Sequence, residues 1–100
     1  MESTGLKKVP TRAERRSAYY GMSDEQLAKS GLRMEITDVT LVLRDVGGDS
    51  LFECPLRQMF NRRWMRYHYG WIEGRKILRL LKTASRRITL RTRKDIENDL

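Results

Sequence analysis

The spacing of hydrophobic residues changes several times along this 100-residue chain, and each change predicts a new structural element. Residues 1–16 are polar and basic and contain almost nothing to bury, which predicts a flexible basic arm. Tyr19 and Tyr20 are the first pair of bulky side chains, so we expect the folded domain to begin near residue 17.

The segment after the tyrosines carries the signals of a short helix. Ser23 and Gln26, three residues apart, have the spacing of a capping box, and Gly31 is a typical helix stop. The sequence therefore predicts a helix over Ser23–Ser30, with Leu27 as its main buried side chain.

From residue 34 onward, apolar residues recur at every second position, which is the period of a half-buried strand. The sequence predicts a β-hairpin whose strands cover Glu35–Val46 and Ser50–Cys54 and whose turn contains Gly47 and Gly48. These glycines are not followed by the Lys-Ser/Thr pair of a phosphate-binding loop, so turn formation is the better interpretation.

Apolar and aromatic residues then recur at intervals of three and four, which is the spacing of one helix face. Pro55 suits the first position of a helix, whereas a glycine costs about 1 kcal/mol in a helix interior. The sequence therefore predicts a helix from Pro55 to Tyr69, a kink or break over Gly70–Gly74, and a second helix over Arg75–Lys82. The apolar stripe consists of Leu56, Met59, Phe60, Trp64, Tyr67 and Trp71.

This stretch also admits a strand, because large residues alternate from Met65 to Trp71. The length of the pattern and the position of Pro55 favour the helix. Phe60, Trp64 and Tyr67 lie at the centre of the stripe and are predicted to be core residues. His68 and Tyr69 lie off the stripe and are the better candidates for exposed contacts.

The last alternating segment, Arg86–Thr92, predicts an edge strand that its arginines protect from pairing with other chains. Together these elements predict a small single α+β domain over residues 17–94, in which the aromatic-basic amphipathic helix, kinked near Gly70–Gly74, packs on a small antiparallel sheet. Residues 95–100 form an acidic C-terminal tail.

Charge is strongly segregated along the chain, which has a formal net charge of +8 and a pI of about 10.2. Residues 17–56 carry seven acidic and three basic residues, whereas residues 56–94 carry 13 basic residues and a single acid, Glu73. The second stretch also contains both tryptophans, Trp64 and Trp71. Dense positive charge interleaved with planar side chains is typical of a surface that binds polyanions.

The candidate nucleic-acid-binding residues follow from this charge distribution. Contacts of such residues with phosphates position a nucleic acid without reading its bases, so we expect low sequence specificity. The candidates are Arg62, Arg63, Arg66, Tyr69, Arg75, Lys76, Arg79, Lys82, Arg86, Arg87, Arg91, Arg93 and Lys94.

Little in the sequence indicates catalysis or a cofactor. A single histidine, His68, and a single cysteine, Cys54, cannot build a Cys/His metal site, and one cysteine excludes an internal disulfide. Asp45, Asp49 and Glu53 cluster around the hairpin turn and could chelate a divalent cation, but aspartates are common in turns for structural reasons. We expect no enzyme activity, cofactor or metal, and, without an apolar run of membrane-spanning length, a cytoplasmic protein.

Three functional hypotheses remain. The first is a small basic regulatory or accessory protein that binds DNA or RNA mainly through phosphate contacts. The second is a protein-interaction or inhibitor module, such as mobile elements encode, whose basic face docks on an acidic partner protein. The third, an RNA-cleaving toxin, would need Arg and Tyr to act without histidine. Nucleic-acid binding should weaken steeply with salt, and docking on an acidic protein less so.

Overall fold

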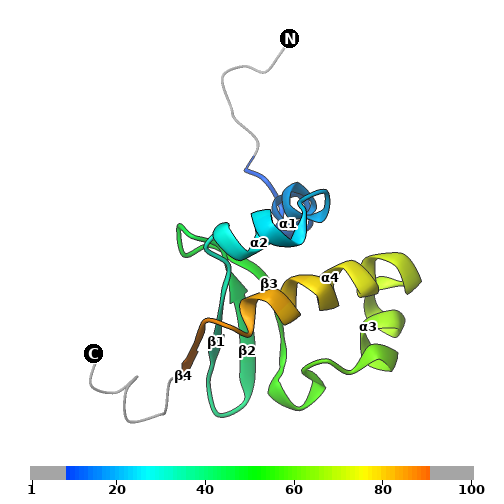
Figure 1. Ribbon diagram of the computed structural model, residues 1–100. Helices are drawn as coiled ribbons and strands as arrows, with labels where there is room; N and C mark the ends of the chain where they lie inside the picture. Colours follow the sequence, from blue (N-terminus) through cyan, green and yellow to red (C-terminus); the bar gives the residue numbers. More distant parts are fainter. Residues whose placement is uncertain (1–8, 91–100) are drawn as a thin grey trace.

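The computed structural model describes residues 9–90, which form an α+β domain around one sheet (Figure 1). The predicted fold class is therefore confirmed. The elements are α1 (Arg12–Tyr20), α2 (Asp24–Lys29), β1 (Arg33–Ile36), β2 (Thr40–Arg44), β3 (Ser50–Pro55), a 3-10 turn η1 (Leu56–Gln58), α3 (Arg62–Tyr69), α4 (Trp71–Ala84) and β4 (Ile88–Leu90).

The sheet has the strand order β3-β2-β1-β4, and its first three strands are antiparallel neighbours. The β2–β3 hairpin is confirmed, but the strand predicted over Glu35–Val46 is two strands. The chain reverses at Thr37, whose hydroxyl accepts a hydrogen bond from the Thr40 N–H at 3.0 Å. The period-two pattern hides this turn because Val39 is apolar, although it lies exposed in the loop.

Strand β4 pairs in parallel with β1 at the outer edge of the sheet, with Met34 opposite Ile88. The strand predicted over Arg86–Thr92 extends past the described residues, so its full extent stays a prediction. The predicted acidic tail, residues 95–100, also lies outside them.

The two predicted helices of the basic stretch exist, but their boundaries differ from those predicted. Pro55 ends β3 instead of starting a helix, and α3 begins only after Asn61, whose side chain accepts a hydrogen bond from the Trp64 N–H at 3.1 Å. The predicted break is confirmed at Gly70, where φ is 87°. Gly74 lies inside α4, so the second helix starts at Trp71 instead of Arg75. The strand alternative for Met65–Trp71 is wrong.

The core lies between the sheet and α4, which crosses its face (Figure 1). The prediction that Phe60 and Tyr67 are core residues is wrong, because both are exposed, as is Trp71 of the predicted stripe. Trp64 is half-buried against the core, and Met65 is the buried residue of α3. The fully buried side chains include Leu27, Met34, Leu41, Leu43, Leu51, Phe52, Ile77, Leu80 and Leu81.

The N-terminal boundary also needs correction. Residues 12–16, predicted to belong to the flexible arm, form the first turns of α1, and Thr11 caps this helix in a capping box with Glu14. Residues 1–8 lie outside the described part of the chain. Helix α2 is confirmed with its Ser23–Gln26 capping box and buried Leu27.

Candidate nucleic-acid interface

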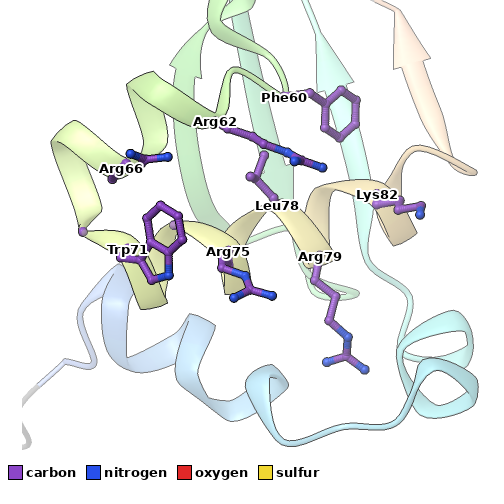
Figure 2. Close-up of a pocket in the computed structure, with 10 residues that line it drawn as sticks. Phe60, Arg62, Arg66, Trp71, Arg75, Leu78, Arg79 and Lys82 are labelled. Carbon is purple, nitrogen blue, oxygen red and sulfur yellow. The ribbon is translucent and has the colours of Figure 1, made fainter.

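A groove with a volume of about 890 Å³ runs along the outer side of the α3–α4 pair (Figure 2). Two cations reach it from α3 and three from α4. Helix α3 contributes Arg62 and Arg66, four residues apart and therefore neighbours on one helix face. The complete lining is Phe60, Arg62, Arg66, Gly70, Trp71, Gly74, Arg75, Leu78, Arg79 and Lys82.

Two glycines shape the α3–α4 pair, one through its backbone conformation and the other through close packing. Gly70 has φ 87° and ψ 172°, a conformation that is almost exclusive to glycine, and it reverses the chain between α3 and α4. Gly74 faces Met65, and a Cβ atom at this position would lie only 3.2 Å from the Met65 carbonyl oxygen. The two glycines therefore set the angle and the spacing of the helices that carry the cations.

The groove is electropositive because none of the described residues in its lining is acidic. Glu73, the single acid of the basic stretch, accepts hydrogen bonds from Arg16 at 3.2 Å and from the Tyr20 hydroxyl at 2.9 Å. Its charge is therefore matched on the α1 side of α4. Within the described residues, Arg62, Arg66, Arg75 and Lys82 form no ion pair.

Arg79 differs from the other groove cations because it also holds the fold together. Its guanidinium donates to the Met22 carbonyl at 2.6 Å and pairs with the Asp24 carboxylate at 2.9 Å. These bonds fasten the start of α2 to α4, and Figure 2 shows the Arg79 side chain extending away from α4. Arg79 contributes to the local potential but is partly neutralised.

Two exposed aromatic rings complete the groove. Trp71 is 57% exposed, and the Arg66 guanidinium lies 4.2 Å from the centre of its ring in a cation–π contact. Phe60, near the opposite end of the groove, is 41% exposed (Figure 2). The combination of cations and open aromatic faces suits phosphates together with flat ring systems.

The other predicted site residues lie outside this lining. Arg63 is exposed on α3, and the Lys76 ammonium lies 5.3 Å from the centre of the Tyr20 ring. Tyr69, predicted to be exposed, is half-buried and packs 5.5 Å from Phe52, so its contact role is not supported.

The C-terminal candidates lie beyond the groove lining. Arg86 and Arg87 are exposed between α4 and β4, and Arg87 donates to the Ala28 carbonyl at 3.4 Å. Arg91, Arg93 and Lys94 lie outside the described residues.

A polar cluster centred on Arg16 is not predictable from the sequence. This side chain is 5% exposed and donates to the Leu51 carbonyl at 2.9 Å, the Tyr20 hydroxyl at 3.1 Å and Glu73. Burial raises the pKa of Tyr20 to about 12. The cluster joins α1, β3 and α4, and no sequence motif marks it because its members are far apart in the chain.

Neither a metal-binding cluster nor a reactive thiol is found among the described residues. No three His, Cys, Asp or Glu side chains come together there in a way that could hold a metal ion. Cys54 is buried in β3, and burial raises the pKa of its thiol to about 11, which keeps it protonated and unreactive. No helix of the described chain is both long enough and apolar enough to cross a bilayer.

Comparisons with known proteins add no family. No protein-family model, no curated protein and no solved structure matches this chain.

Proposed function

We propose that this protein binds nucleic acid in the groove between α3 and α4, mainly through contacts with phosphates. One observation carries the proposal: five cations from two helices line one groove, and none of the described residues beside them is acidic. A formal charge of this density repels itself and lowers the stability of the fold. Phosphate binding would account for this arrangement, because the attraction between the cations and the phosphates offsets the repulsion among the cations.

The chemistry of the side chains supports a phosphate ligand. Four of the five cations are arginines, whose planar guanidinium groups bind phosphate oxygens in pairs of hydrogen bonds. Contacts of this kind hold DNA or RNA without reading its bases, so the proposed binding has low sequence specificity. The protein would act as a cytoplasmic regulatory or accessory factor, not as an enzyme.

The test is a titration of random-sequence DNA and RNA over a range of salt concentrations. The variant Arg62→Gln/Arg75→Gln/Lys82→Gln removes three groove cations and spares Arg79, which holds α2. We expect weaker binding to all sequences and a log–log salt slope that is smaller by roughly 2–3, about one for each lost phosphate contact.

A matched control is Lys29→Gln/Arg63→Gln/Lys76→Gln, which removes the same charge from exposed positions outside the groove lining. It should retain most of the affinity and more of the salt slope than the groove variant. Equal losses in the two variants would mean that net charge, not the groove, drives binding. Wild-type protein that binds neither DNA nor RNA would contradict the proposal, and an acidic protein partner would then be the leading alternative.

A further inference from the structure

Trp71 has an environment that differs from that of an ordinary surface tryptophan. It lies directly after Gly70 in the first turn of α4, where 57% of its surface stays exposed. The Arg66 guanidinium lies over the ring, 4.2 Å from its centre. A large, exposed and oriented aromatic ring beside several cations is the arrangement that stacks on a nucleic-acid base.

Phe60 provides an independent observation at the other end of the groove. Its φ is 60°, in the left-handed region that bulky side chains rarely adopt, and it is the single non-glycine residue of the described chain with a positive φ. Such strain costs of the order of 1–3 kcal/mol and is concentrated at functional sites. Here it does not bury the ring, which lines the groove and is 41% exposed.

Exposed aromatic rings can interact differently with double-stranded and with single-stranded nucleic acid. In a double helix the bases are stacked on one another and present only their edges and the backbone. An unpaired strand can turn its bases outward onto aromatic side chains while its phosphates remain near arginines. The span from Trp71 to Lys82 along α4 is about 16 Å, which accommodates a few nucleotides of an extended strand.

From these observations we infer that the groove selects single-stranded nucleic acid, with an unpaired base stacked on Trp71 and the adjoining phosphates held by Arg66 and Arg75. This inference rests on the proposed function and names the form of nucleic acid that the same site takes. The shared ligand chemistry is an unpaired base with flanking phosphates, which both DNA and RNA provide.

The experiment compares four probes: a short single strand of DNA, the same sequence in RNA, the corresponding duplex, and a single strand of equal length without bases. The wild-type protein should prefer both single strands to the duplex and to the abasic strand. Trp71→Ala should weaken binding to the single strands roughly 5- to 140-fold, the range for loss of one stacked base, and leave the abasic strand and the salt slope unchanged. Tyr67→Ala removes an 85% exposed aromatic of α3 that does not line the groove, and it should have little effect.

A second readout uses the fluorescence of Trp71 in the Trp64→Phe background. The single strand should quench this fluorescence, and the abasic strand should not. Equal affinity for duplex and single strand, with no effect of Trp71→Ala, would overturn the inference while leaving phosphate binding in the groove intact. Failure of the wild-type protein to bind any of the four probes would instead remove the proposed function itself.

Discussion

At the scale of single residues, Arg16 shows how a charged side chain can become part of the interior. Only 5% of its surface is exposed, yet its guanidinium donates to a carbonyl, a hydroxyl and a carboxylate. Buried charges persist where they are paired and hydrogen-bonded in this way. The partners Leu51 and Glu73 are 35 and 57 residues away, so the arrangement leaves no local trace in the sequence.

Replacing this arginine tests how much α1 depends on it. Arg16→Ala leaves the buried Leu51 carbonyl without this donor and the Glu73 carboxylate without its positive partner, and we expect a loss of about 1–3 kcal/mol in the free energy of unfolding. Arg12→Ala is the matched control on the same helix, because the Arg12–Glu53 pair has side chains that are 51% and 45% exposed. Exposed pairs contribute about 0–1 kcal/mol, so denaturant unfolding should separate the two variants. Equal losses of unfolding free energy in the two variants would show that the buried Arg16 contacts stabilise the fold no more than an exposed ion pair does.

Tyr20 gives the same cluster a dependence on pH. Burial raises the pKa of its hydroxyl from 10.0 to about 12, so the folded chain keeps this proton at a pH where the unfolded chain loses it. Stability from this group is fully present below pH 10 and is lost as the pH rises through about 12. Denaturant unfolding from pH 9 upward should therefore show a steeper loss of stability in the wild type than in Tyr20→Phe. Tyr67→Phe, a change at an exposed ring, should follow the wild type.

At the scale of elements, the capping box and the turn residues correctly predict the helix and the turn that depend on contacts between residues close in sequence. The Ser23–Gln26 capping box correctly places α2, and the hairpin turn correctly places the junction of β2 and β3. Pro55 does not identify its element, because its fixed φ suits both the start of a helix and the end of a strand. Its pairing with Thr40 places it at the end of β3. Tertiary contacts, which the sequence does not display, decide such cases.

Gly70 is the element-scale position with the clearest test. Nothing lies within 4 Å of a Cβ atom built there, so Gly70→Ala meets no steric obstacle beyond its own backbone. Its φ of 87° with ψ 172° should nevertheless make the change cost about 1–3 kcal/mol. Gly21→Ala is the control, since Gly21 has ordinary right-handed angles and similarly open space. Thermal unfolding should show a lower melting temperature for Gly70→Ala alone, and a tolerated Gly70→Ala would contradict the role of this turn.

The same glycine explains why the candidate site was only partly predictable. Charge counting identifies the correct stretch, but the predicted apolar stripe places Trp71 on the same face as Leu56 although a break is expected at Gly70–Gly74. Helix α4 starts anew after Gly70, so Trp71 does not continue the face of α3 and lines the groove instead. Arg62 lines the groove and its neighbour Arg63 does not, a distinction that needs the orientation of α3 in space.

At the scale of the whole molecule, the acidic and basic halves do not cancel. Of the acids in residues 17–56, Glu35 pairs with Arg44 of the sheet and Glu53 with Arg12 of α1. Within the described residues, Asp24 is the one that forms an ion pair with a groove cation, Arg79. Among the described residues, four of the five groove cations therefore remain without an acidic partner.

The Arg16–Glu73 contact also couples the N-terminal helix to the groove thermodynamically. If α1 opens locally, the carboxylate of Glu73 loses its partners in α1 and becomes an unmatched negative charge on α4, the helix that also carries Arg75. A polyanion should then bind the closed form more tightly and, by reciprocity, hold α1 closed. Bound nucleic acid should slow hydrogen exchange in the amides of Arg12–Tyr20, and Glu73→Gln should reduce this protection. Unchanged exchange upon binding would show that helix and groove open independently.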